Sequence, residues 1–389
     1  QQVHKVVKQL DTAVNPLLVA LVPQIKKSYV KGGVPFRRQC IRCFRLIHGP
    51  HAGRHLHKMK ILLLHETPDL LWVPGQGFRK RHQHIVLNAK IFSDIVRKLP
   101  DDMVEIVCDD HYMTTIRCGL SEFNLIGASP AEFPELPNVE KSQGIKLSCK
   151  LLRSMIDHTV FAVSDNENKP IHTGSLFEIT GNQLTVVSVD GYRLAMSQEE
   201  VENGKTENLS FVVPGETLKE ISRIIPDSED KMVHIYPEKK HALFEVEGTL
   251  VTTRLLEGEF LNYRNAIPND CTTKLEINVK SIIDCVERVS LIISERLKNP
   301  IRCCFEGNSL KISCVTSLGR AYDECTIENC PEKIEIGFNN RYLLDALRAC
   351  PEEKVVLELK SSLSPCVIRP VEGTKFLYMV LPVRLKADA

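Results

Sequence analysis

Hydrophobic positions recur at helical spacing in three segments of the chain that match one another without gaps. The segments are 88–100, 214–226 and 339–351, and their terminal prolines lie 126 and 125 residues apart. Counted back from each proline, the eighth, fifth and first positions are apolar in every copy. This spacing predicts three helices of about three turns, each with one buried face and each ended by a proline that cannot donate the next backbone hydrogen bond.

The same segments share a pair of charges. The third position before the proline is always Arg and the sixth is always acidic, which gives the pairs Arg97 and Asp94, Arg223 and Glu220, and Arg348 and Asp345. Charges three residues apart on a helix form a surface ion pair worth roughly 0.2 to 0.5 kcal/mol, so pairing within each helix is one interpretation. Contact with phosphate is the other, and an Arg can serve both in turn.

Further elements repeat around these helices. Apolar-rich extended segments at 103–108, 232–236 and 354–359 follow them and predict strands. Residues 146–160 and 276–290 show helical periodicity, and residues 174–180 and 184–189 predict strands joined by a turn at Gly181 and Asn182. Each unit therefore has two helices and several antiparallel strands, so the expected fold class is α+β, with one module used three times.

Five phrases in order along the chain carry a family resemblance. They are KLPDD (98–102), FP (133–134), SVDGYRLA (188–195), IGFNNRYLLD (336–345) and YMVLPVRL (378–385). Because these phrases occur in this order on the repeat, residues 85–389 resemble the bacterial sliding clamps, the beta subunits of DNA polymerase III. The resemblance implies three clamp domains, at 1–142, 143–271 and 272–389. It also implies a head-to-tail homodimeric ring around duplex DNA, with helices lining the hole and sheets outside.

The resemblance also implies the function and the partners. A sliding clamp is a non-catalytic processivity factor of the polymerase holoenzyme, a nucleotidyltransferase complex. It binds duplex DNA without regard to sequence, the replicative polymerase, the clamp loader and other proteins with a clamp-binding motif, and it needs no cofactor or metal. A sliding ring must touch phosphates weakly, because each neutralised phosphate adds salt-dependent affinity. The residues expected to face DNA are Lys90, Arg97, Lys98, Arg153, Lys219, Arg223, Arg341 and Arg348.

Clamp-binding peptides in this family dock in an apolar cleft between the second and third domains and against the carboxyl-terminal tail. Carried over residue by residue, the cleft comprises His172, Val189, Gly191, Tyr192, Arg193, Leu194, Leu261, Tyr342, Leu363, Pro365, Met379, Val380, Leu381, Pro382, Val383, Arg384 and Leu385. Met and aliphatic residues give an adaptable floor, and the two Arg can hold peptide carbonyls or an acidic flank. Ordinary core packing is the alternative for the Leu and Val residues and for Tyr342.

Two departures from the family pattern affect this cleft. His172 replaces a residue that is usually aliphatic, and Asn265 and Ala266 replace a basic and a larger apolar residue. We therefore expect a somewhat different peptide preference.

The family pattern also places the ring-closing contact. Phe123 and Leu125 of one copy are expected to face Ile292 and Ile293 of the other. The alternative is that all four residues fill the cores of their own domains.

Composition agrees with a soluble globular chain of more than one domain, at 389 residues, 43% hydrophobic and 25% charged. The charge is uneven. Residues 1–84 hold 15 Lys and Arg against 3 Asp and Glu, a net of +12, which leaves −11 for residues 85–389 because the total is +1. Such asymmetry indicates a nucleic-acid partner or a composite sequence.

Residues 1–84 do not follow the repeat, and three interpretations stay open. Cys40, Cys43, His51 and His55 suggest zinc, although only seven residues separate the two pairs. A basic DNA-binding arm is the second interpretation. The third, which we favour, is an altered reading frame, because it explains the abrupt change in composition and the missing half of a domain together. Residues 79–84 can be written with codons that, read one base later, spell Glu-Lys-Gly-Ile-Ser, which would join naturally to residue 85. In that case most of the first half of the first domain is not native, and the ring is not expected to close.

Other features exclude common classes. The 14 cysteines are scattered through a long chain, so free thiols in a reducing cytoplasm are expected. No apolar run is long enough to cross a bilayer. No phosphate loop or nucleophile motif occurs, and Asp109, Asp110 and His111 predict a charged turn rather than a metal site. The alternative to a clamp is a zinc-dependent nucleic-acid enzyme that uses the amino-terminal Cys and His residues.

Overall fold

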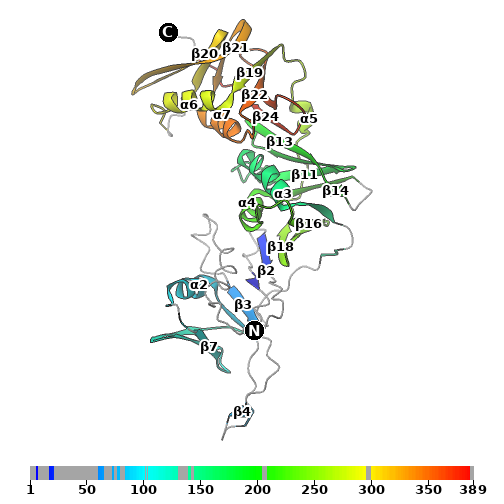
Figure 1. The fold of residues 1–389 in the computed structure, drawn as a ribbon, viewed down its shortest axis with the longest axis vertical. Helices are drawn as coiled ribbons and strands as arrows, with labels where there is room; N and C mark the ends of the chain where they lie inside the picture. Colours follow the sequence, from blue (N-terminus) through cyan, green and yellow to red (C-terminus); the bar gives the residue numbers. More distant parts are fainter. Residues whose placement is uncertain are drawn as a thin grey trace. The chain divides into compact units, whose positions relative to one another are not determined.

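The computed structural model describes residues 6–7, 17–21, 60–64, 72–73, 77–78, 84–100, 102, 104–129, 139–141, 144–203, 208–294 and 299–385. They fall into two compact units (Figure 1). The first unit is drawn from residues 1–150 and 220–255, and the second from residues 151–219 and 256–389. The expected middle domain contributes to both units, and the domain bounds at 142 and 271 remain a prediction.

The repeat helices form where the sequence predicts them. The described helices are α2 (Ala89–Lys98), α3 (Cys149–Asp157), α4 (Gly215–Ile224), α5 (Tyr263–Ala266), α6 (Val279–Ser290) and α7 (Asn340–Arg348), with short 3-10 helices η4 (Val160–Ala162) and η5 (Pro170–Thr173). Asn88 and Asn339 cap α2 and α7 through side-chain oxygens that accept backbone N–H groups. The apolar stripe is buried, as Phe92, Leu218 and Leu343 show at 1%, 0% and 5% exposure. The three-helix prediction is therefore confirmed.

The first unit is built from antiparallel sheets. Its strands are β1 (Val6–Val7), β2 (Leu17–Leu21), β3 (Lys60–Leu64), β4 (Trp72–Val73), β5 (Gly77–Phe78), β6 (His84–Asn88), β7 (Val104–Cys108), β8 (Met113–Cys118), β9 (Ser121–Ile126), β10 (Ile145–Ser148), β16 (Met232–Pro237), β17 (His241–Val246) and β18 (Thr249–Arg254). Strands β7, β8 and β9 form one sheet, and β2, β18, β17, β16 and β10 are consecutive in another. Phe92, Val96 and Leu99 of the α2 segment pack in one cluster with Ile116 and Cys118 of β8.

The second unit contains an eight-stranded antiparallel sheet in the order β15-β11-β12-β13-β24-β23-β22-β19. Its strands, with β14 and the long hairpin, are β11 (Gly174–Thr180), β12 (Gln183–Val189), β13 (Arg193–Glu200), β14 (Glu202–Asn203), β15 (Leu209–Pro214), β19 (Thr273–Asn278), β20 (Ile301–Thr316), β21 (Gly319–Phe338), β22 (Lys354–Leu359), β23 (Cys366–Pro370) and β24 (Phe376–Val380). Because β13 pairs with β24, the sheet joins strands from both sides of the predicted boundary at residue 271.

Two helices begin later than their periodicity predicts. Residues 145–148 form β10 and residues 273–278 form β19, so α3 starts at Cys149 and α6 at Val279. Burial alternates along both strands, which is the period of an extended chain. Asn278 then starts α6, because its side-chain oxygen accepts the N–H of Ser281 at 3.0 Å.

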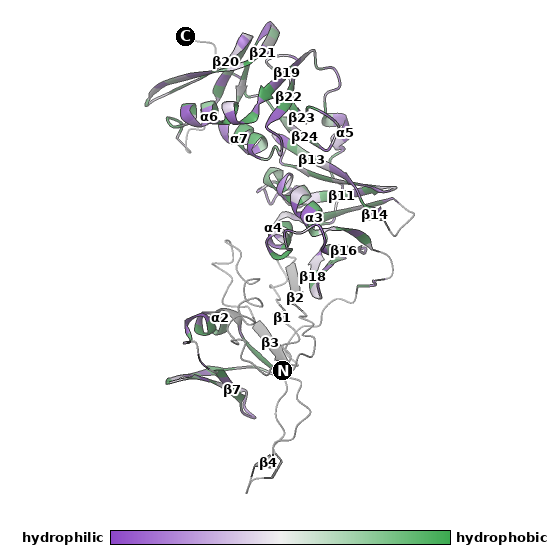
Figure 2. Cartoon of the chain, viewed as in Figure 1, coloured by the Kyte–Doolittle hydropathy of each residue, from purple (hydrophilic) through white to green (hydrophobic). Residues whose placement is uncertain are grey.

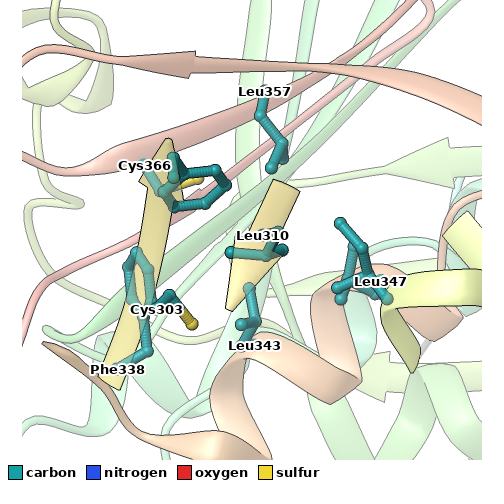
Figure 3. A pocket seen from close by; sticks show the side chains of 9 residues that line it. Cys303, Leu310, Phe338, Leu343, Leu347, Leu357 and Cys366 are labelled. Atoms are coloured by element: carbon teal, nitrogen blue, oxygen red, sulfur yellow. The ribbon is translucent and has the colours of Figure 1, made fainter. Parts of the chain in front are cut away.

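Helices α6 and α7 lie side by side in the second unit, and both carry hydrophobic and hydrophilic residues (Figure 2). Their apolar faces contribute to a core that leaves a cavity of about 10 Å³ (Figure 3). Its lining residues include Cys303, Leu310, Leu347 and Cys366, and all of them have apolar or thiol side chains.

The cysteines in the described part of the chain are free thiols, as expected. No helix among the described residues is long and apolar enough to cross a membrane.

Candidate functional site

A tight turn between β12 and β13 holds the motif that is central to the predicted cleft. The side chain of Asp190 accepts the backbone N–H groups of Tyr192 at 2.8 Å and Arg193 at 3.0 Å. Gly191 has φ +91°, a conformation that glycine adopts with little strain. The acid and the glycine therefore shape the turn, and they leave Tyr192 61% exposed at its tip.

Arg193 is held from several sides. Its Nε donates to Asp190 at 2.8 Å and its Nη1 donates to Asp345 of α7 at 2.6 Å. The guanidinium also lies over the ring of Tyr342, 4.5 Å from the centroid, and over the ring of Phe161 at 5.5 Å. Its side chain is 10% exposed. Arg193, the first residue of β13, is thus held against helix α7 by charge and by aromatic contact.

The two tyrosines of the predicted cleft lie against each other. The rings of Tyr192 and Tyr342 stack with centroids 5.9 Å apart. Burial, followed by the nearby Asp190 charge, raises the pKa of Tyr342 above its ordinary value, so its hydroxyl stays protonated. Tyr342 therefore contacts residues of the cleft motif and does more than fill the core behind α7.

The carboxyl-terminal segment runs beside this turn. The backbone N–H of Leu381 donates to the carbonyl of Tyr192 at 2.9 Å, and that of Val383 donates to Gly337 at 2.8 Å. A Cβ on Gly337 would lie 2.4 Å from the Val383 oxygen, so the segment crosses β21 at a point that requires glycine. Val383 and Arg384 are exposed, while Leu381, Pro382 and Leu385 are half-buried.

An apolar cluster lies beneath the turn and the tail. It joins Val189, Leu194 and Met379 of the predicted cleft in one buried group, with Leu381 packed at its edge. Val380 is fully buried in β24. Four residues of the predicted cleft are therefore core residues that support its floor from beneath: Val189, Leu194, Met379 and Val380.

The remaining predicted cleft residues lie nearer the surface. His172 is half-buried and its ring meets Phe260 edge to face at 5.6 Å. Burial and then the charge of Lys169 lower its pKa, which favours the neutral ring. Leu261 is 44% exposed and Leu363 is 67% exposed, while Pro365 is half-buried.

The segment that carries Leu261 is fixed to the sheet. Tyr263 of α5 is buried, and its hydroxyl donates to Glu178 of β11 at 2.8 Å. Arg264 also donates to Glu178 and lies 4.7 Å from the Tyr263 ring centroid. Ala266, which belongs to the second departure from the family pattern, packs against the apolar cluster beneath the turn.

The predicted DNA-facing residues lie on the helices. Arg97 pairs with Asp94 at 3.8 Å and Arg223 with Glu220 at 2.7 Å, so the within-helix pairing is confirmed in two copies. In the third copy it is wrong, because Arg348 pairs with Glu287 of α6 at 2.6 Å. All three Arg side chains are 42% to 54% exposed. Such surface pairs contribute about 0 to 1 kcal/mol, so they do not prevent an exchange of partner.

The other predicted DNA-facing residues differ in exposure. Lys219 pairs with Glu216 at 3.1 Å, Lys98 and Arg341 are exposed, and Arg153 is half-buried. The side chain of Lys90 lies outside the described residues.

The expected ring-closing residues are partly exposed in their own units. Phe123 is 36% exposed, and Leu125 packs against the core beside α2. Ile293 packs against the core of the second unit, and Ile292 is half-buried. Their contact with another copy stays a prediction.

The acidic motif after β7 is a turn, as predicted. Asp109 accepts the backbone N–H groups of His111 at 2.9 Å and Met113 at 2.8 Å. In the described part of the chain, no three His, Cys, Asp or Glu side chains gather as they would around a metal ion. Cys40, Cys43, His51 and His55 lie outside the described residues.

Sequence reasoning missed three residues of this site. Asp190 and Asp345 hold Arg193, and Phe161 supplies a second ring beside it. Asp345 was visible only as a repeated helix charge. Its partner Arg193 lies 152 positions away in the sequence, so the pairing could be identified only once the fold was known.

Family models match the chain in three consecutive segments. The N-terminal domain of the DNA polymerase III beta subunit matches residues 75–137, the central domain residues 146–262 and the C-terminal domain residues 264–384. The beta sliding clamp of Halalkalibacterium halodurans is 34% identical over 311 residues, which are 78% of this chain and 81% of that protein. That of Bacillus subtilis is 32% identical over 303 residues, 77% of this chain and 80% of that protein.

Solved structures agree. A putative DNA polymerase III beta subunit from Eubacterium rectale has a TM-score of 0.78 at 34% identity, covering 89% of this chain and 97% of that one. The Bacillus subtilis sliding clamp has a TM-score of 0.80 at 26% identity, covering 90% and 98%.

Proposed function

This chain belongs to the family of bacterial DNA polymerase III beta subunits, the sliding clamps, and on that premise we propose which of its residues serve each partner. The chain is a processivity clamp and not an enzyme. Its partners are DNA, the polymerase and a second copy of the chain. The proposal has three further parts. The clamp loader and other clamp-binding proteins dock at the cleft that the polymerase uses, and the two copies of the chain are arranged head to tail. The protein is located in the cytoplasm, where bacterial DNA lies.

The partner cleft is the surface formed by the turn at Asp190–Arg193, the tail from Leu381 to Leu385 and the exposed Leu261 and Leu363. One observation supports it above the others: the backbone of Leu381 is hydrogen-bonded to Tyr192, which brings two separate motifs of the sequence together. The exposed Tyr192 ring and the apolar cluster beneath it suit the capture of an apolar peptide.

A truncation tests the cleft. A chain that ends at Val380 keeps every strand of the eight-stranded sheet and loses the tail. We expect it to fold, as followed by circular dichroism, and to lose binding of a fluorescein-labelled peptide copied from the polymerase of the same genome. Unchanged affinity in fluorescence polarisation would show that the cleft lies elsewhere.

Arg97, Arg223 and Arg348 are proposed to contact phosphates. Their equivalent places on the three repeat helices and their weak surface pairings support this role. Neutralising all three to Gln should shorten the retention of the clamp on nicked circular DNA while the ring stays intact in light scattering. It should also reduce the salt dependence of retention, because about one counterion is released for each phosphate contact. Equal retention and equal salt dependence would remove these residues from the DNA interface.

Ring closure is proposed to use Phe123 and Leu125 of one copy against Ile292 and Ile293 of the other. Their partial exposure on their own units supports a contact of this kind. Replacing Ile292 with Asp should convert dimers to monomers in light scattering, with Ile283→Val in α6 as a control for packing changes.

The interpretation of residues 1–84 as an altered reading frame is tested by the nucleotide sequence around codons 75–90. Zinc binding by these residues is tested by metal analysis of the purified protein.

A further inference from the structure

The third repeat helix uses the acidic residue of the repeat differently from the other two. In α2 and α4, the acid six positions before the proline pairs with the Arg three residues later. In α7, the equivalent Asp345 instead accepts a hydrogen bond from Arg193 of β13, at 2.6 Å. Arg348 is held by Glu287 of α6. The acid has therefore been redirected from its own helix to the turn that carries Tyr192.

The contact is more buried than an ordinary surface pair. Arg193 is 10% exposed and Asp345 is 26% exposed, whereas the Arg97 and Asp94 side chains are 42% and 49% exposed. A charge that loses its partner in such a place is costly, because water does not replace the lost hydrogen bond. Asp190 would then be the carboxylate that still holds Arg193, and it belongs to the same turn, so it does not tie that turn to α7. The link to α7 would be left to the weaker contact of the guanidinium with the Tyr342 ring.

We propose that Asp345 is a positioning residue for the partner cleft: it anchors Arg193 to α7 and so keeps the rings of Tyr192 and Tyr342 stacked beside the tail. Tyr342 lies one turn before Asp345 on the same helix, so a single rigid element supplies both the ring and the carboxylate. Leu381 is bonded to Tyr192, so a displaced turn would also displace the tail. The inference rests on the proposed partner cleft.

The repeat supplies matched control variants. Asp345→Asn is compared with Asp94→Asn and Glu220→Gln, which remove the charge at the same repeat position in the other two helices. Affinity for the fluorescein-labelled polymerase peptide is measured by fluorescence polarisation. We expect about a tenfold loss for Asp345→Asn, equivalent to about 1.4 kcal/mol, and less than a twofold change for either control. DNA retention should be unchanged in Asp345→Asn.

Two further variants separate positioning from general stability. Asp345→Glu keeps a carboxylate and should recover most of the affinity. Adding Asp345→Asn to Arg193→Met should cause no further loss beyond Arg193→Met alone, because the anchored cation is already absent. An additional loss in the double variant would show that Asp345 acts otherwise than through Arg193 and would overturn the inference. The double variant also serves if Asp345→Asn alone does not fold, since it removes the guanidinium together with its carboxylate partner on α7.

The outcomes also distinguish this inference from the proposed function. If the wild-type chain does not bind the peptide, the proposed cleft fails and the role of Asp345 fails with it. If the wild type binds and Asp345→Asn binds equally well, only the positioning role is overturned. If all three acid variants lose affinity alike, the effect belongs to net charge and the inference is again overturned.

Discussion

Replacing Gly337 with Ala is expected to detach the carboxyl-terminal segment without disturbing the sheet. The new Cβ would lie 2.4 Å from the Val383 carbonyl oxygen and 2.7 Å from a Leu385 methyl carbon, both far closer than van der Waals contact. The φ of Gly337 is not in the left-handed region, so alanine fits the backbone itself. Because β21 is held by its pairing with β20 while the tail is held by few bonds, the tail is the part that moves.

The size of the effect is limited by what the tail contributes. Moving the segment breaks the hydrogen bond from Val383 to Gly337, worth about 0.5 to 1.5 kcal/mol. It also exposes part of the half-buried Leu385, worth about 1 kcal/mol. The free energy of unfolding should therefore fall by about 1 to 3 kcal/mol, and the polymerase peptide should bind more weakly because the tail forms one side of the proposed cleft.

Three measurements test this reasoning. Chemical denaturation gives the loss of stability, fluorescence polarisation gives the peptide affinity, and hydrogen exchange reports whether the Val383 amide becomes unprotected. The control is the same substitution in a chain that ends at Val380, where the clashing atoms are gone and the substitution should cost nothing. Wild-type protection of the Val383 amide, or an equal cost in the truncated chain, would refute the argument.

Three other substitutions have expected outcomes. Gly191→Ala places a side chain at φ +91° and should destabilise the turn by about 1 to 2 kcal/mol and weaken peptide binding. Gly191→Asn should weaken peptide binding less in the same polarisation assay, because asparagine tolerates a positive φ better than alanine does. Burial lowers the pKa of His158, so the folded chain binds a proton on this ring less readily than the unfolded chain does. The free energy of unfolding should therefore fall as the pH drops below about 6.5, the ordinary pKa of histidine. His158→Gln should reduce that loss in denaturation curves measured between pH 7.5 and 5. Leu347→Ala, at a fully buried position beside the cavity, should cost about 2 to 5 kcal/mol in chemical denaturation, and a loss below 1 kcal/mol would contradict the packing described for α7.

The periodic features of the chain were predictable from sequence. The stripe of Phe92, Leu218 and Leu343 follows the helical period and is buried in all three copies. Helix starts were less predictable, because apolar residues spaced two apart in β10 and β19 also satisfy part of a helical pattern. The first residues of both segments form strands because their burial alternates, and in the second segment the capping Asn278 marks the start of the helix.

The contacts of the candidate site were predictable only in part. The Asp-Gly turn follows from local chemistry, since an Asp side chain bonds the backbone two residues on and Gly accepts positive φ. The partner of Asp345 did not follow, because two positively charged residues were available and only the fold brings Arg193 nearer than Arg348. Long-range pairs of this kind are set by how β13 joins β24, which neither propensity nor spacing encodes.

The third helix also explains how one repeated module can serve two purposes. All three copies keep the buried stripe, because each helix must pack on its own core. The exposed charge pairs of α2 and α4 carry no such constraint, since each contributes under about 1 kcal/mol and either partner can be lost at small cost. In α7, Asp345 pairs with Arg193 and Arg348 pairs with Glu287, so both repeat charges have partners outside their own helix. The same repeat position therefore contacts the cleft turn in α7 and its own helix in α2 and α4, while the buried stripe holds all three helices on their cores.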